Sequence, residues 1–187
     1  MKLPQKDNPW KIIDNQPGYD NNWIRLTHYK VLNPAGNPGE YTIIHFKNRA
    51  VGIICLDEDN NTILVGQHRF PLNKYSWEIP EGGSKYDEEP LTTAKRELHE
   101  ETGVKAAKWD LIQEFDISNS ITDEKAYLFL ARGLTYETAH PDEDEQLEMK
   151  KLPFSEVYQA VLDGQIRDSL TVVAVLKIQT LLLENKL

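Results

Sequence analysis

The segment DEEPLTTAKRELHEETGV, residues 87–104, most constrains how this chain can fold, because it carries the signals of one well-defined helix. Pro90 suits the first helical position, and the acidic residues before it lie where the helix dipole favours negative charge. Gly103 suits a left-handed stop at the other end. The apolar stripe that would face a core consists of Leu91, Ala94 and Leu98.

The same helix would carry three carboxylates on one face. Glu97, Glu100 and Glu101 stand at i, i+3 and i+4, and like charges at that spacing repel by roughly 0.2–0.5 kcal/mol per pair on an exposed helix. Such a cluster suits a hard divalent cation such as Mg²⁺, which is held by a few carboxylates together with substrate phosphates. From the helix alone, a solvated glutamate-rich surface is the alternative.

The length, net charge and cysteine content of the chain exclude several classes of protein. The 187 residues suffice for one domain, with or without a small extension, and the net charge of -9 gives no basic footprint for nucleic acid or anionic lipid. No apolar run approaches the ~18 residues of a membrane span, and no signal-peptide pattern stands at the N-terminus. The single cysteine, Cys55, fits a reducing compartment, so we expect a cytoplasmic protein that binds neither nucleic acid nor membrane.

Turn residues divide the rest of the chain into short elements. Residues 1–48 hold alternating runs that predict two or three strands joined by turns. Runs 49–57 and 62–70 predict a hairpin, and a strand at 76–80 is expected to end in a sharp turn at Gly82 and Gly83. The remaining predicted elements are strands at 109–117, 125–134 and 147–152 and helices at 154–164 and 169–185, the last of which is expected to begin near Asp168 or Ser169. This mixture predicts an α+β or mixed α/β sandwich.

Residues 82–104 also carry a long fixed spacing: Gly82, five residues, Glu88, seven residues, and then RELHEETGV. This segment resembles the Nudix box at every fixed position. The resemblance implies an α/β/α sandwich around a mixed sheet, and hydrolysis, with Mg²⁺ or Mn²⁺, of a nucleoside diphosphate linked to another group. By the same resemblance, Glu97 and Glu101 are metal ligands, Glu100 assists, Arg96 orients the glutamates, and Glu88 supports the loop or a further metal.

Outside the box, GQHRF, WEIPEGG and GQIRDSLTVVAVLKI are similar to the branch that cleaves ADP-ribose or other nucleoside diphosphate sugars. That branch implies that the backbone carbonyl of Glu81 joins the metal shell. It also implies a homodimer that exchanges N-terminal strands. The residues it places against the substrate are Trp23, stacked on the base, Arg69, Gly83 and Glu124. We therefore divide the chain into an N-terminal strand extension, residues 1–48, and a Nudix hydrolase domain, residues 49–187.

The acidic stretch HPDEDEQ supplies the last two expected site residues. The resemblance implies that Glu143 is the general base and Glu145 a metal ligand, although Asp142 and Asp144 leave the assignment open by a residue or two. No proline stands near Asn119, where ADP-ribose-specific members tend to carry one, so other nucleotide sugars remain open. The alternatives are a Nudix nucleoside triphosphate pyrophosphatase and a non-catalytic Nudix domain that senses ADP-ribose.

Overall fold

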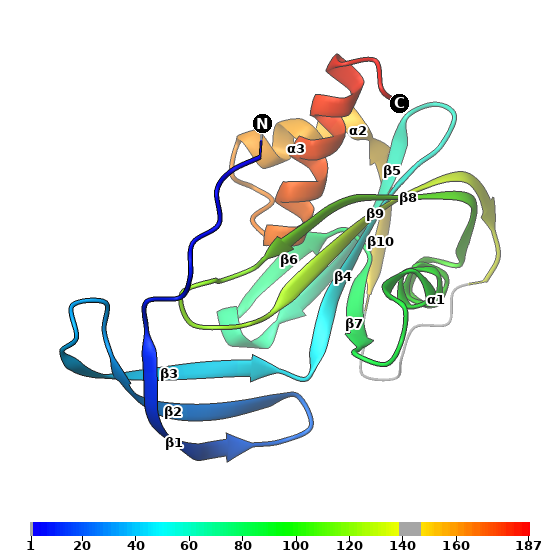
Figure 1. Cartoon of the computed structure of the whole chain (residues 1–187). Helices are drawn as coiled ribbons and strands as arrows, with labels where there is room; N and C mark the ends of the chain where they lie inside the picture. The colour runs from blue at the N-terminus through cyan, green and yellow to red at the C-terminus, as the bar shows by residue number, and fades with distance from the viewer. Residues whose placement is uncertain (1, 139–146) are drawn as a thin grey trace. The chain divides into compact units, whose positions relative to one another are not determined.

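The computed structural model describes residues 2–138 and 147–187 (Figure 1). The chain forms two compact units. The first comprises the residues up to Lys47 together with Ser118–Glu124, and the second comprises Asn48–Ile117 together with Lys125–Leu187.

The first unit is a three-stranded antiparallel sheet of β1 (Lys11–Asp20), β2 (Ile24–Leu32) and β3 (Pro38–Phe46), in that order. The prediction of two or three N-terminal strands is therefore confirmed. Residues 118–124 join this sheet, because the amide of Ile44 donates to the carbonyl of Ile121 at 3.0 Å. Every residue of β1 is exposed, so this strand contributes no buried side chain to a core within its own unit.

The second unit contains two sheets and three α-helices among its described residues. One sheet has the order β7-β4-β9-β8 and is mixed, because β4 pairs parallel with β9 while the outer pairs are antiparallel. The other sheet has the order β10-β5-β6. The elements are β4 (Asn48–Leu56), β5 (Asn61–Arg69), a 3-10 turn (Phe70–Leu72), β6 (Lys74–Glu78), β7 (Glu81–Lys85), α1 (Pro90–Thr102), β8 (Val104–Asp116), β9 (Lys125–Tyr136), β10 (Glu148–Pro153), α2 (Phe154–Leu162) and α3 (Ser169–Leu183).

The side chains of β4 point alternately to the two faces of the sheet, and this alternation explains the layers of the second unit. Val51, Ile53 and Cys55 pack with Ala94 and Leu98 of α1 in one buried cluster. Ile54 and Leu56, from the opposite face of the strand, pack with residues of α2 and α3 in a second cluster. The four-stranded sheet thus lies between α1 on one face and α2 with α3 on the other. The predicted α+β fold, an α/β/α sandwich around a mixed sheet, is confirmed.

Two local predictions were wrong. The runs predicted as a hairpin form β4 and β5, which belong to different sheets, because β4 already pairs with β7 and β9 and β5 with β10 and β6. The sharp turn predicted at Gly82 and Gly83 is instead part of β7, where these glycines pair with Val51 and Ala50.

The predicted helix ends agree with the structure. Helix α1 begins at Pro90, and Gly103 follows it with φ 69°, in the left-handed region that favours glycine. Asp168 caps α3 by accepting a hydrogen bond from the Thr171 amide at 2.7 Å. None of the described helices is long and apolar enough to cross a membrane.

Candidate active site

Gly82 of β7 lies close to the side chain of Glu97 on α1. A Cβ atom on Gly82 would lie 2.1 Å from Cδ of Glu97, so any side chain there would overlap the carboxylate. Glycine at this position therefore leaves room for the Glu97 carboxylate against the strand, and a side chain there would displace that carboxylate. The backbone of Gly82 is extended, so conformational freedom is not the reason for a glycine here.

Arg96 holds two of the three helix carboxylates. Its Nη2 lies 2.6 Å from Oε1 of Glu97, and its Nη1 lies 2.7 Å from Oε2 of Glu100. Burial alone would lower the pKa of Arg96, but these two carboxylates raise it. The third carboxylate, Glu101, is only 4% exposed. The repulsion expected on this helix face is therefore partly offset by one guanidinium.

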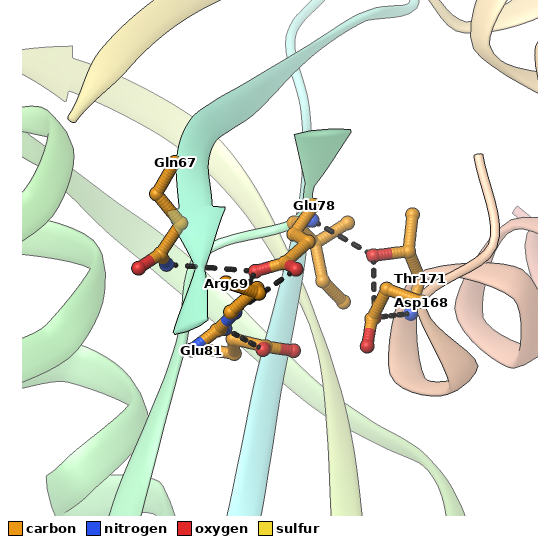
Figure 2. Close-up of polar contacts among 7 residues, drawn as sticks. Gln67, Arg69, Glu78, Glu81, Asp168 and Thr171 are labelled. Carbon is orange, nitrogen blue, oxygen red and sulfur yellow. Dashed lines mark hydrogen bonds and ion pairs between the residues drawn. The ribbon is translucent and has the colours of Figure 1, made fainter. Parts of the chain in front are cut away.

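A second carboxylate group lies at the start of β7. Oxygen atoms of Glu78, Glu81 and Asp168 all lie within 4.8 Å of one another (Figure 2). Arg69 enters this group from β5: its Nε lies 3.0 Å from each oxygen of Glu78, and its Nη2 lies 2.5 Å from Oε2. The same Nη2 also donates to Oε1 of Glu81. Arg69 therefore bridges two carboxylates, as Arg96 does.

The raised pKa of Glu81 distinguishes this carboxylate group from the one on α1. Burial raises the pKa of Glu81 well above its ordinary value, and the charges of Asp168 and Glu78 raise it further, against the effect of Arg69. The charge of Glu101 on helix α1 acts in the same direction. Oε2 of Glu81 is buried and accepts no hydrogen bond from the described residues. A buried carboxylate oxygen of this kind is suited to a cation.

Thr171 ties this group to helix α3. Its hydroxyl donates to Oδ2 of Asp168 at 2.8 Å and accepts from the amide of Ile79 at 2.9 Å (Figure 2). The residue after Glu78 is thereby joined to the first turn of a helix about 90 residues later in the chain. The cap of α3 thus also positions Asp168 beside Glu78 and Glu81.

Comparison with known proteins identifies the family. Residues 46–171 match the model of the NUDIX domain, which is more than half of the chain. The chain belongs to the Nudix family. An ADP-ribose pyrophosphatase of Bacillus subtilis (strain 168) is 35% identical over 171 residues, which cover 90% of this chain and 92% of the relative. The predicted family and enzyme class, a Nudix pyrophosphatase, are confirmed.

Two further similarities complete the comparison. A methanol dehydrogenase activator of Bacillus methanolicus is 33% identical over 171 residues, with the same coverage of both chains. A crystal structure of an ADP compounds hydrolase superimposes with a TM-score of 0.81 and covers all of both chains at 18% identity. At that identity the structural match supports the Nudix fold alone.

The loop of the Nudix box is held by Arg49, a residue that the sequence did not single out. Its Nη2 donates to the carbonyl of Lys85 at 2.6 Å and also to that of Glu88. Its guanidinium lies 5.5 Å from the ring centroid of Tyr86 and 5.7 Å from that of Tyr127. Strand β4 thereby fixes the backbone between β7 and α1.

Glu88, the second fixed residue of the Nudix box, is also held within the protein. Its Oε2 accepts a hydrogen bond from the hydroxyl of Thr93 at 2.9 Å. Thr93 is buried in the first turns of α1. This contact agrees with the loop-supporting role that the resemblance implied for Glu88, and the further metal remains the other alternative.

The other predicted residues lie in different places. Gly83 follows Gly82 in β7, and a Cβ there would lie 3.1 Å from the side-chain nitrogen of Asn48. Trp23 is 67% exposed and belongs to the first unit, as does Glu124, whose pKa burial and the neighbouring Asp123 raise. Glu143 and Glu145, with the adjacent Asp142 and Asp144, lie outside the described residues.

Sequence reasoning missed Glu78 and Asp168 as members of the site. Asp168 was assigned only to the start of a helix, which is also its position in the structure. Glu78 did carry a signal: it is a charged residue within the short apolar run SWEIP, and buried charges are rare unless they are paired. Its partner, Arg69, could not be assigned without knowing that β5 pairs with β6.

Proposed function

We propose that this Nudix protein hydrolyses the pyrophosphate bond of a nucleoside diphosphate sugar such as ADP-ribose, releasing a nucleoside monophosphate and a sugar phosphate. The observation that carries the proposal is the Nudix box, with Glu97 seated over Gly82 and bonded to Arg96. The name of the Bacillus subtilis relative, ADP-ribose pyrophosphatase, supports this class of substrate.

The residues fit a divalent cation, Mg²⁺ or Mn²⁺. Two observations support a metal site between α1 and β7: Glu97 lies close to Gly82, and the charge of Glu101 acts on Glu81. Glu97, Glu101 and the carbonyl of Glu81 would hold the metal, with Glu145 as a further ligand. When bound, such a metal neutralises phosphate charge and lowers the pKa of a bound water. Arg96 then orients Glu97 and Glu100, which assists the metal ligands.

The general base is proposed to be Glu143. A carboxylate in hydrogen-bonding reach of the attacking water takes its proton as the bond to phosphorus forms. Glu143→Gln should then lower turnover without changing the Mg²⁺ requirement, whereas Glu145→Gln should raise that requirement. A Mg²⁺ titration of both variants that gave the opposite pattern would reverse the two roles.

We propose that Arg69 contacts the substrate through the Nη1 nitrogen of its guanidinium. Its Nε and Nη2 are taken by Glu78 and Glu81. Its Nη1 donates no hydrogen bond to any described residue, so this nitrogen is the one we assign to a substrate phosphate or sugar. An arginine can supply this contact without competing for the metal.

The first unit is proposed to complete the site in a homodimer. A three-stranded sheet with an exposed edge strand is marginal by itself, and two-fold dimers are the commonest oligomers. In this proposal Trp23 stacks on the base, Gly83 brings backbone close to the ligand, and Glu124 contacts substrate. Light scattering at micromolar concentration should give twice the chain mass of 21.5 kDa, and a monomer mass would exclude the dimer.

A hydrolysis screen tests the function. Purified protein is incubated with Mg²⁺ and, separately, ADP-ribose, other nucleoside diphosphate sugars or nucleoside triphosphates, and the products are separated by chromatography. We expect a nucleoside monophosphate and a sugar phosphate from at least one nucleotide sugar. Glu101→Gln, folded by circular dichroism, is the inactive control. Turnover of triphosphates alone would favour the triphosphatase alternative, and tight binding of ADP-ribose without turnover would favour the sensor.

A further inference from the structure

A cleft lies on the side of helix α1 that faces β8. Its volume is about 500 Å³, and the side chains from α1 that line it include Lys95, Arg96 and His99. Lys105 and Trp109 line it from β8. Of these residues, the proposed reaction uses only Arg96. The proposed reaction therefore does not explain the other side chains that line the cleft.

The helix side of this cleft is a basic stripe. Thr92, Lys95, Arg96 and His99 stand at i, i+3, i+4 and i+7, so they share one face of α1. Helix α1 thus presents carboxylates on one side and cations on a neighbouring one. The whole chain carries a net charge of -9, so three basic side chains on one helix face contrast with its overall composition.

Carboxylates pair with most of these cations, since Glu97 and Glu100 are bonded to Arg96. Glu137 accepts from Lys105 at 2.6 Å and from the ring of His99 at 3.1 Å, and these bonds lower the pKa of Glu137. Lys95 has no ion pair with any described residue. Among the described residues, Lys95 is therefore the cation of this stripe that is left without an ion pair, and it lines the cleft together with Lys105.

Trp109 gives the cleft a fixed apolar wall. Its indole N–H donates to the carbonyl of Ala106 at 3.1 Å, and its ring packs against the buried cluster beneath α1. The indole is partly exposed, so a planar group could lie against it. Two lysines beside such a wall suit a phosphate group, with or without an attached base.

We propose that this basic cleft, lined by Lys95, Arg96, His99, Lys105 and Trp109, binds a phosphate-bearing anion at a site separate from the metal-binding carboxylates. The ligand is either free phosphate or pyrophosphate, or a nucleoside monophosphate. The last is the product class of the proposed reaction, although binding here does not depend on that reaction. Because Arg96 borders both sites, an anion in the cleft would compete with Glu97 and Glu100 for its guanidinium. Binding in the cleft and metal binding would then influence each other.

The test is a binding titration without catalysis. Wild-type protein in EDTA is titrated with inorganic pyrophosphate and, separately, with inorganic phosphate and AMP, by calorimetry. EDTA removes divalent metal, so the carboxylate face of α1 repels these anions and retained binding reports the cleft. Binding should be saturable and should weaken as KCl is raised, since exposed charges are screened.

Charge-reversal variants locate the binding. Lys95→Glu and Lys105→Glu should each weaken binding by roughly tenfold or more, the effect of losing one charged hydrogen bond to an anion. Lys108→Glu is the matched control, because Lys108 lies on the same strand but outside this cleft, and it should bind as the wild type does. Circular dichroism checks that each variant is folded. Glu101→Gln should bind anions normally.

The titrations distinguish a nucleotide ligand from a free phosphate group. AMP binding tighter than phosphate supports a nucleotide ligand with its base on Trp109, whereas equal binding supports a free phosphate group. Lack of saturation up to about 10 mM pyrophosphate would overturn the proposal. So would an equal loss of binding in Lys108→Glu, which would indicate a non-specific charge effect. Since no turnover is measured, failure here leaves the proposed hydrolysis untouched.

Discussion

This Nudix domain contains two groups of carboxylates that are each held by one arginine, and the two groups are built in opposite ways. Arg96, Glu97 and Glu100 come from five consecutive positions of helix α1. Arg69, Glu78 and Glu81 come from three strands, β5, β6 and β7. The first group is a product of local sequence, whereas the second exists only once the strands have paired.

Burial also separates the two groups. The difference lies in one carboxylate of each group: Glu100 is 34% exposed and Glu78 is 3% exposed. Glu97 and Glu81 are both 14% exposed, and Arg96 and Arg69 are 42% and 36% exposed. An exposed ion pair contributes little to stability, because water solvates either partner when the other is lost. A buried carboxylate that loses its cation is left without solvent or partner. We therefore expect the helix group to matter mainly for chemistry and the strand group mainly for the fold.

The largest expected effect is on catalysis, through Glu97. Glu97→Gln removes a proposed metal ligand and should lower turnover of the substrate found in the screen by about 10³-fold, the loss of several kcal/mol of transition-state stabilisation. Its free energy of unfolding in EDTA should stay level or rise, because one repulsive charge is gone. Urea unfolding together with steady-state kinetics measures both. A variant that unfolds at a clearly lower urea concentration than the wild type would contradict the expectation that the helix group matters mainly for chemistry.

Arg69→Met should have the largest effect on stability. It leaves the buried Glu78 and the neighbouring Glu81 without their cation, which typically costs 3–5 kcal/mol. The double variant Arg69→Met with Glu78→Gln should recover part of that loss, because the uncompensated charge is removed. Urea unfolding of both proteins in EDTA gives the comparison. A single variant as stable as the wild type would show that the strand group does not hold the fold.

Arg96→Met is the matching change in the helix group. The free energy of unfolding should fall by only ~0–1 kcal/mol, the usual worth of exposed ion pairs. Activity should fall by roughly 10–100-fold, because groups that orient metal ligands have effects of that size. The loss should appear as a higher Mg²⁺ concentration for half-maximal rate. An unchanged Mg²⁺ dependence would mean that Arg96 does not orient Glu97 and Glu100.

The same contrast explains what the sequence could predict. The box helix, its proline start and its glycine end depend on neighbouring residues, so short-range rules located them. The cap at Asp168 was found in the same way. The membership of Asp168 in a carboxylate group was not found, because it depends on Glu78 and Glu81 arriving from other strands.

Strand pairing is where sequence reasoning failed. β4 and β5 follow each other along the chain, and adjacent strands usually pair, so a hairpin was the natural prediction. The four-stranded sheet instead places β9 beside β4, a partner about 75 residues away. Gly82 was misplaced for a similar reason, since the carboxylate that a side chain there would displace comes from the next element.

The smallest expected effect concerns the Asp57–Lys151 ion pair. It tests whether the contribution of an ion pair to stability depends on burial or on the separation of its residues along the chain. Asp57, at the end of β4, lies 2.7 Å from Lys151 of β10, so this pair also depends on the fold. Burial acts to raise the pKa of Asp57, but the bonds from Lys151 and from Asn61 outweigh it and lower that pKa to about 2.

Because the folded-state pKa of Asp57 lies below its unfolded value, the ionised form stabilises the protein above about pH 4, and this contribution is lost as the pH falls toward 2. Because Lys151 is 47% exposed, solvent screens this pair, so Asp57→Asn should cost only about 1 kcal/mol of unfolding free energy at pH 7 and almost nothing near pH 2. Urea unfolding at a series of pH values measures this difference. A loss as large as that of Arg69→Met would mean that joining distant strands, rather than burying a charge, makes such a pair essential. A difference between the two proteins that stayed constant with pH would assign the effect to packing instead of the Asp57 charge.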